Sequence, residues 1–250
     1  MIDYNPFALE GKTILVTGSS SGIGRSIAVE CSKMGASLVI TGRNTERLNE
    51  TMQLLEGKGH LALTADLSDE SCLKEFVEQL PQLNGIVHNA GVSRRMPAKL
   101  IKSDDIETIF KTNFNGAVLL QKYILKGKKL LNESSVVFID SLAPFAPTVG
   151  NALYSASKAA ILGYANVLSL ELAPQLIRVN SICPAMVWTD LIEKEATMMG
   201  VDYTELQKKY PLKRFGRPED IAYLAIYLLS DASSWMTGSA LEITGGSKSF

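Results

Sequence analysis

A short apolar strand that runs directly into a glycine-rich turn, and then into a helix, most constrains how this chain can fold. The strand is predicted over residues 13–17, whose β-branched and apolar side chains are typical of a strand buried on both faces. The turn reads Gly18-Ser19-Ser20-Ser21-Gly22-Ile23-Gly24, and a helical pattern follows over 25–34. Such a unit lets a diphosphate approach both the backbone and the helix N-terminus, so it predicts a nucleotide site. A flexible turn without a ligand is the alternative.

Strands and helices continue to alternate along the chain with no linker between them. Further strands are predicted over 37–41, 61–64, 85–88, 136–139, 177–182 and 241–243. Further helices are predicted over 45–55, 69–80, 103–126 and 153–172. The alternation predicts one α/β domain over 1–250, built as a doubly wound, Rossmann-type, seven-stranded parallel sheet with helices on both faces. A ligand is expected at the carboxyl ends of the strands, where the strand order reverses.

The predicted helix at 153–172 carries a tyrosine and a lysine at helical spacing. Tyr154 and Lys158 are four residues apart, so they share one face of the helix. A cation beside a phenol favours its ionised form, and such a tyrosine can exchange a proton with a carbonyl oxygen or an alcohol. A surface tyrosine packed on a lysine stem is the alternative.

Together these residues resemble the short-chain dehydrogenase/reductase family, and the resemblance covers nearly the whole chain. The matching residues follow the family's order: Thr17-Gly18-x-x-x-Gly22-x-Gly24, Asp66, Asn89-Ala90-Gly91, Asn113, Ser141, Tyr154-x-x-x-Lys158, Pro184 and Gly245-Gly246. Two positions depart from the family pattern. His88 stands where asparagine is frequent, and Ala185 stands where glycine is common after the proline. We expect His88 to be a buried structural imidazole, with a functional histidine as the alternative.

The resemblance implies a catalytic set of Asn113, Ser141, Tyr154 and Lys158. Tyr154 would act as general acid/base while Lys158 promotes its ionisation and holds the nicotinamide ribose. Ser141 would polarise the substrate carbonyl, although a serine at a strand end also caps turns. Asn113 would sit at a kink in the long helix and hold a water on the proton path.

The resemblance also implies a set of cofactor-binding residues. They are Gly18, Ser20, Ser21, Gly22, Ile23, Gly24, Arg43, Asn44, Asp66, Leu67, Asn89, Ala90, Gly91, Tyr154, Lys158, Pro184, Val187 and Thr189. No acid follows the second strand, and Arg43 can pair there with a 2′-phosphate, so NADP(H) is predicted over NAD(H). A solvated arginine is the alternative for Arg43, and a strand-end turn with Ser68 is the alternative for Asp66.

Residues 185–217 match the stretch that covers substrate in this family. They include Trp188, Met198, Met199, Tyr203, Tyr210 and Phe215. These side chains predict an apolar or aromatic substrate lining, and anchoring of a mobile lid is the alternative.

Composition restricts the kind of partner and compartment. Apolar residues make up 46% of the chain and the net charge is −1, which argues against a nucleic-acid or membrane-surface binder. No segment resembles a signal peptide or a membrane span. Three dispersed cysteines indicate reduced thiols in a cytoplasmic protein, and two histidines make a metal site improbable.

The favoured function is an NADPH-dependent ketoreductase of the 3-oxoacyl-thioester type. Arg94, Arg95 and Lys99 would provide a basic landing patch for the carrier of such a substrate, or would simply form a solvated loop. A sugar or polyol dehydrogenase of the same family is one alternative, and a non-catalytic NADP-binding scaffold or sensor is another. The small residues Ala156, Ala159, Ala160 and Gly163 favour a homodimer or homotetramer through the helix at 153–172, or tight packing within one chain.

Overall fold

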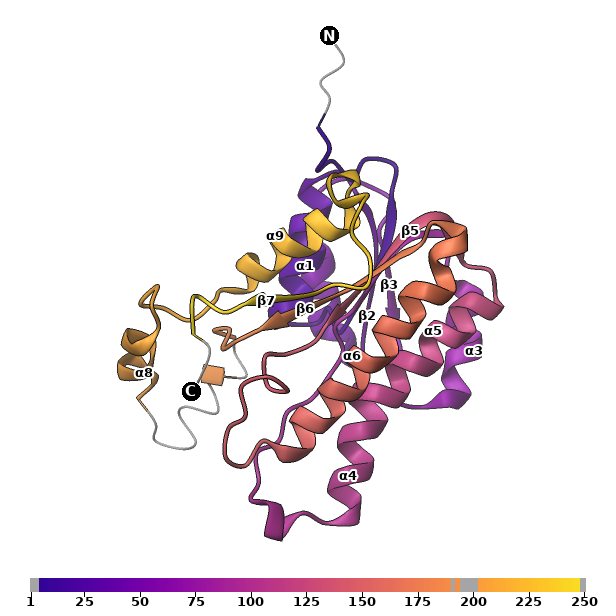
Figure 1. The fold of residues 1–250 in the computed structure, drawn as a ribbon. Helices are drawn as coiled ribbons and strands as arrows, with labels where there is room; N and C mark the ends of the chain where they lie inside the picture. The colour runs from indigo at the N-terminus through magenta and orange to yellow at the C-terminus, as the bar shows by residue number, and fades with distance from the viewer. Residues whose placement is uncertain (1–4, 190–191, 194–201, 248–250) are drawn as a thin grey trace.

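The computed structural model describes residues 5–189, 192–193 and 202–247. Its centre is a seven-stranded sheet in the order β3-β2-β1-β4-β5-β6-β7, with every neighbouring pair parallel. The strands are β1 Thr13–Thr17, β2 Ser37–Gly42, β3 Leu61–Thr64, β4 Leu83–His88, β5 Leu130–Ile139, β6 Arg178–Pro184 and β7 Ala240–Ile243. The order confirms the predicted doubly wound sheet and places its reversal between β1 and β4 (Figure 1).

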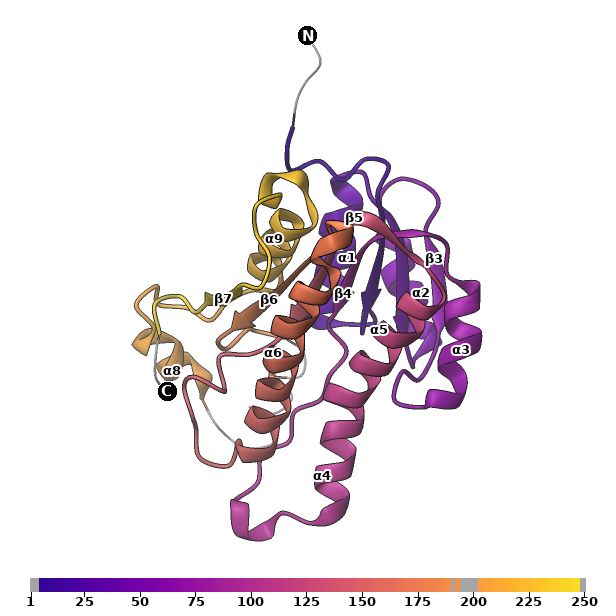
Figure 2. The same ribbon diagram turned by 45° about the vertical axis from the view of Figure 1, so that its right-hand side comes forward.

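Helices cover both faces of this sheet (Figures 1 and 2). The longer helices are α1 Gly22–Lys33, α2 Thr45–Gln53, α3 Glu70–Gln79, α4 Ser103–Phe110, α5 Gly116–Lys126, α6 Ala152–Leu172, α8 Tyr203–Lys209 and α9 Pro218–Leu229. The face bearing α1, α2 and α9 is opposite the face bearing α3, α5 and α6. In Figure 2, α4 extends below the sheet in line with α5. None of the helices among the described residues is both long and apolar enough to cross a membrane.

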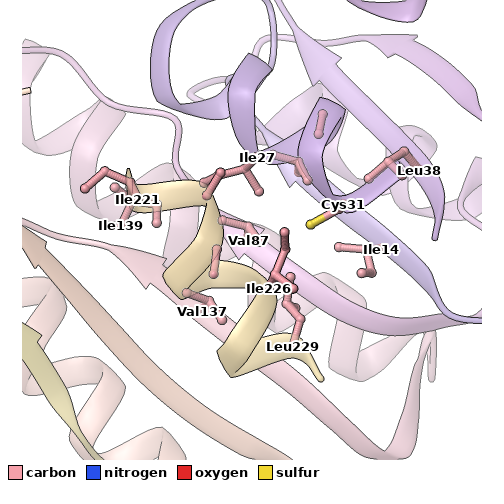
Figure 3. Close-up of a cluster of buried hydrophobic side chains, with 14 of the residues drawn as sticks. Ile14, Ile27, Cys31, Leu38, Val87, Val137, Ile139, Ile221, Ile226 and Leu229 are labelled. Atoms are coloured by element: carbon pink, nitrogen blue, oxygen red, sulfur yellow. The ribbon is translucent and has the colours of Figure 1, made fainter. Parts of the chain in front are cut away.

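The core on the α1/α9 face consists of branched aliphatic side chains contributed by strands and helices alike. Figure 3 shows Ile27 and Cys31 of α1, together with Ile226 of α9, around the strand residues Ile14 and Val87. All five are buried. Because β1 is buried on both faces, it reads as a nearly continuous apolar run, which is why the sequence identifies it.

The core on the opposite face contains a polar pair within an aromatic setting. The His88 ring stacks on Phe138 with centroids 4.7 Å apart, and its Nε2 lies 2.9 Å from Oε1 of Gln121. Burial lowers the pKa of His88 to about 4, an effect that the hydrogen bond to Gln121 only partly opposes. His88 is therefore a neutral core residue, in line with the structural interpretation of this position.

The long helix predicted over 103–126 is interrupted by a π-helical turn. The turn, η2 Lys111–Asn115, separates α4 from α5, and the amide of Gly116 donates to the carbonyl of Lys111, five residues back. Apolar spacing continues on both sides, so the sequence pattern alone reads as one helix. The turn coincides with the kink that the family resemblance implied at Asn113.

Strand β5 begins six residues before the predicted start at 136. Leu130 pairs with Leu83, but the register shifts before Gly85 pairs with Ser135. Glu133 lies in this irregular part with a φ of 62°, in the left-handed region. The strand signal fails here because the bulged residues are polar and do not alternate.

Buried His88 makes stability depend on pH. Its pKa in the folded chain lies near 4, below the ordinary value of 6.5, so the unfolded chain takes up the proton first. The free energy of unfolding should therefore fall by up to about 3 kcal/mol as the pH drops from 6.5 towards 4. His88→Gln should flatten this dependence in urea titrations at successive pH values. Equal slopes for the parent and the variant would contradict the assignment.

Candidate active site

A cavity of about 700 Å³ opens at the carboxyl ends of the strands, beside the β1/β4 reversal. Most of the residues singled out from the sequence line it, coming from elements far apart in the chain. They are Gly18, Ser20, Ser21, Gly22, Ile23, Arg43, Asn44, Asp66, Leu67, Asn89, Ala90, Gly91, Ser141, Tyr154, Lys158, Pro184, Val187 and Thr189. Gly24 and Asn113 are not in its wall and support it from behind.

Two glycines of the turn are required by its geometry. Gly18 has a φ of 66°, which other residues rarely adopt. A Cβ on Gly24 would lie 2.3 Å from the carbonyl oxygen of Gly18, so only glycine lets α1 pack this closely on the turn. The first residues of α1, Gly22 and Ile23, line the cavity, which places the N-terminus of a twelve-residue helix at its wall.

Thr17 and Asn89 hold the glycine turn against the end of β4. The hydroxyl oxygen of Thr17 accepts from the backbone N–H groups of Asn89, at 2.9 Å, and Ala90, at 3.0 Å. The side-chain amide of Asn89 donates to the carbonyls of Thr17, at 3.0 Å, and Gly18, at 3.2 Å. Asn89 thus shapes the cavity by fixing the glycine turn. Thr17 belongs to the sequence motif, but the motif did not indicate that its hydroxyl holds the end of β4.

One end of the cavity carries two arginines. Arg43 and Arg47 both line it, and the sequence interpretation included only Arg43. Asn44, between them, accepts a hydrogen bond from the Arg47 backbone N–H at 2.9 Å and so caps α2. The sequence motif does not indicate Arg47, because Arg47 reaches the cavity only through its position in the first turn of α2.

Asp66 lies near this end and forms the turn with Ser68 that the alternative interpretation described. It accepts from the backbone N–H of Ser68 at 3.0 Å and from its hydroxyl at 2.7 Å. Partial burial opposes ionisation of Asp66, but these hydrogen bonds and the charge of Arg43 outweigh it and lower its pKa. Asp66 therefore presents a carboxylate to the cavity while closing the turn.

At the other end, α6 brings Tyr154 and Lys158 together. The Lys158 ammonium lies 5.9 Å from the centre of the Tyr154 ring. It is buried and donates to the carbonyl of Ile139 at 2.7 Å, which ties α6 to the end of β5. Ser141 follows β5, and its Oγ accepts from the Ala143 N–H at 3.1 Å. Because that bond uses only a lone pair of Oγ, the hydroxyl proton is left for another acceptor.

Asn113 supports this end from the π-helical turn. Its side-chain oxygen accepts from the Val92 N–H at 2.7 Å, and its amide donates to the Val92 carbonyl at 2.9 Å and to Ser157 Oγ at 3.0 Å. One buried side chain therefore joins the loop after β4 to α6. No motif in the sequence indicated Ser157 as its partner.

A buried carboxylate next to Ser141 was missed by the sequence interpretation. Asp140 lines the cavity, and burial raises the pKa of its carboxyl to about 7, which the positive charge of Lys158 opposes. The only available signal was an acidic residue at the end of a fully apolar strand. The described residues contain no cluster of three or more His, Cys, Asp or Glu side chains that could hold a metal ion.

The segment predicted to cover substrate is anchored on the body and also reaches the cavity. Phe215 stacks with Trp188 at 5.9 Å and, with Tyr203 and Tyr210, forms a small buried cluster. Tyr203 also lines the cavity, whereas Tyr210 and Phe215 do not. Met198 and Met199 lie outside the described residues. Tyr203 therefore fits the predicted substrate lining, whereas Tyr210 and Phe215 fit the alternative, in which the aromatic residues anchor the segment.

The three residues of the predicted basic patch lie in different surroundings. Arg94 is ion-paired with Asp105 of α4, so its charge is largely neutralised. Arg95 lines the cavity, and Lys99 is exposed on η1 Ala98–Leu100 nearby in the chain.

The cavity residues fit a nicotinamide dinucleotide. The glycine turn approaches α1 so closely that no Cβ fits at Gly24, as a diphosphate site at a helix N-terminus requires. A phenol, a buried ammonium and a serine hydroxyl line the opposite end, which can polarise a carbonyl and deliver a proton.

Comparison with known proteins agrees with this geometry. Residues 18–248 match the family model described as Enoyl-(Acyl carrier protein) reductase. The chain is 34% identical to the 3-oxoacyl-(acyl-carrier-protein) reductase of Aquifex aeolicus, over 95% of this chain and 98% of that one. Among solved structures, a glucose/ribitol dehydrogenase of the short-chain family from Brucella melitensis is 30% identical, with a TM-score of 0.89 over 97% of this chain and 98% of that one.

A third relative was solved with bound NADP at low occupancy. It is provisionally assigned as an NAD(P)-dependent gluconate 5-dehydrogenase, from Beutenbergia cavernae. It is 29% identical, with a TM-score of 0.85 over 97% of this chain and 98% of that one. The fold, the spacing of the cavity residues and these matches over almost the full length agree. The chain belongs to the short-chain dehydrogenase/reductase family of oxidoreductases.

Proposed function

We propose that the protein reduces the ketone of a 3-oxoacyl thioester with NADPH. The observation that carries the proposal is the convergence of Tyr154, Lys158 and Ser141 at one end of a single cavity, with a glycine turn and two arginines at the other. A dinucleotide bound along this cavity would place its nicotinamide at the tyrosine end. The cofactor supplies the hydride, and the chain supplies position, polarisation and a proton.

The residues of the chain have distinct parts in this reaction. The Ser141 hydroxyl, already oriented by the Ala143 N–H, donates to the carbonyl oxygen of the substrate. Tyr154 delivers the proton to the same oxygen as negative charge develops there. Lys158, fixed by the Ile139 carbonyl, would stabilise the ionised phenol that remains and would hold the ribose hydroxyls of the cofactor. Asn113 fixes both the loop after β4 and α6, so it holds these groups in register.

NADP is the proposed form of the cofactor. Arg43 and Arg47 line the end of the cavity where the adenosine ribose would lie, and the residue that ends β2 there is Gly42, not an acid. A guanidinium forms paired, charge-assisted hydrogen bonds with a phosphate, so the two arginines favour a 2′-phosphate.

A thioester on a carrier is the proposed substrate. Curated relatives over almost the full length of the chain are 3-oxoacyl-(acyl-carrier-protein) reductases, from Aquifex aeolicus and Thermotoga maritima among others. Arg95 in the cavity wall and exposed Lys99 provide positive charge for an acidic carrier or its phosphate. A polyol is the competing substrate, because a solved relative with the same fold is a glucose/ribitol dehydrogenase.

A homodimer or homotetramer formed through α6 is proposed as the assembly. Ala156, Ala159, Gly163, Val167 and Leu170 are all exposed, and their spacing places them along one stripe of the helix. A Cβ on Gly163 would meet nothing within 4 Å, which removes the alternative of tight packing within the chain at this position. The three cysteines are all free thiols, which supports a reducing compartment, and we propose the cytoplasm.

Tyr154→Phe tests the reaction. With acetoacetyl thioester as substrate, this variant should lose about 100- to 10,000-fold in kcat, because the proton donor is gone, while NADPH still binds. NADPH oxidation followed by absorbance, together with fluorescence titration of NADPH, provides both readouts. Tyr164→Phe is the matched control, since Tyr164 lies on the same helix but packs on Phe138 away from the cavity. Full turnover by Tyr154→Phe would refute the mechanism. Turnover of polyols alone would refute the proposed substrate.

Arg43→Ala tests the choice of cofactor. Loss of a charged hydrogen-bonding partner should raise the KM for NADPH roughly ten- to 100-fold and leave the KM for NADH nearly unchanged. Lys58→Ala, which removes an exposed cation outside the cavity, is the control. An equal rise in both KM values would show that Arg43 does not contact the phosphate.

Gly163→Arg tests the assembly. The position has room for a side chain within one chain, so the variant should fold, but a charged group in the stripe should yield monomers. Analytical ultracentrifugation measures the mass, and Gln53→Arg, on exposed α2, controls for added charge. An unchanged oligomer would place the interface elsewhere.

A further inference from the structure

Asp140 is a buried carboxylate that the mechanism above does not use. Its exposed fraction is 3%, and it lines the same cavity as Tyr154 and Lys158. Neither carboxylate oxygen makes a hydrogen bond with any residue in the described part of the chain. Its backbone N–H donates to Ile182 at 2.7 Å, so the end of β5 is held in place. Burying a carboxylate that makes no well-formed hydrogen bond destabilises a folded chain, and an amide or hydroxyl there would remove the cost of burying the charge.

The strand pairing identifies the neighbours of Asp140. Phe138, two residues earlier, packs on the α6 face, so alternation directs Asp140 towards the same face. Ile139 pairs with Ile182, which makes Cys183 of β6 the lateral neighbour of Asp140. From α6, Lys158 reaches the carbonyl directly before Asp140.

Lys158 is the cation that faces this carboxylate. Burial raises the pKa of Asp140 to about 7, while Lys158 and the nearby N–H of Ser141 favour the ionised form. Burial, then Asp140 and then Glu242 of β7, raise the pKa of Cys183 to about 12, so that thiol stays neutral. Among the described residues, the charged or titrating groups that act on Asp140 or on its neighbour Cys183 are Lys158 on α6 and Glu242 on β7. Tyr154, one helical turn before Lys158 on α6, lines the same cavity.

We propose that Asp140 is a positioning residue that acts through Lys158 and keeps Tyr154 in its proton-donating form. An ionised Asp140 offsets part of the positive potential that Lys158 imposes on the phenol, so less of the phenol ionises as the pH rises. The proton donor for carbonyl reduction is thereby kept available up to a higher pH. This role rests on the proposed function, because it is defined by the proton that Tyr154 delivers.

The test measures ionised Tyr154 directly, without substrate or cofactor. Ultraviolet absorbance of tyrosinate is recorded at one fixed alkaline pH for the parent and for Asp140→Asn, each referenced to the same chain carrying Tyr154→Phe. Asp140→Asn should raise the ratio of tyrosinate to tyrosine at position 154 roughly tenfold. Asp69→Asn, a carboxylate-to-amide change at the exposed cap of α3, should leave it unchanged. An unchanged ratio in Asp140→Asn would overturn the proposal.

Thermal unfolding shows whether Asp140 carries charge in the folded chain. Its folded pKa, about 7, lies above the ordinary value of 3.8, so stability falls as the pH rises from 3.8 to 7. Asp140→Asn should therefore raise the Tm at alkaline pH relative to the parent. A lower Tm there would mean that the carboxylate is a structural contact, and would overturn the proposal. If Asp140→Asn fails to fold, Asp140→Ser serves in both measurements.

The pH dependence of turnover gives the functional readout. For thioester reduction, activity of Asp140→Asn should decline at a lower pH than that of the parent, because Tyr154 loses its proton earlier. A decline at the same pH would overturn the proposal. Absence of thioester turnover in the parent would refute the proposed substrate and leave the tyrosinate measurement intact.

Discussion

Parallel pairing of β1 with β4 is the constraint on which the rest of this protein depends. The chain adds β2 and β3 on one side of β1 and then β4 to β7 on the other, so the connections that follow β1 and β4 diverge at the carboxyl ends of these two strands. The loops that follow β1 and β4 cannot fill the space between them, and the cavity lies there. Thr17 and Asn89 then use four hydrogen bonds to hold those two loops together. A binding site thus follows from strand order before any reactive side chain is considered.

The two ends of the cavity are built by different means. At the glycine turn the backbone itself forms the wall, so position depends on the absence of side chains, as at Gly24. At the reactive end the wall carries functional side chains, and hydrogen bonds such as that from Lys158 to Ile139 hold them in place. The glycine turn can be rigid although it carries no side chain whose reactivity depends on its surroundings. The reactive end is tuned by nearby charge, which is where Asp140 acts.

The sequence predicts those features that repeat or occur in a motif. Buried strands such as β1 were found within a residue because both of their faces are apolar, and most of the motif residues do line one cavity. Features that depend on where a single residue lies in the folded structure were not predicted. The early, bulged start of β5 has no alternation, and Arg47 reaches the cavity only through the phase of α2. Asp140 belongs to no motif, and its significance comes from Lys158, which is distant in sequence and adjacent in space.

The π-helical turn at Lys111–Asn115 has a consequence for how this chain can vary. A π turn holds one more residue than an α turn, so the helix gains a residue without a matching gain in length. Removing one residue between α4 and α5 would restore continuous α-helical hydrogen bonding and leave the buried faces of both helices in place. It would also rotate Asn113 by about 100° away from Val92 and Ser157. A shortened chain could therefore fold well and yet lose the link between the loop after β4 and α6. At this turn, the length of the chain matters to the site as much as the identity of its residues.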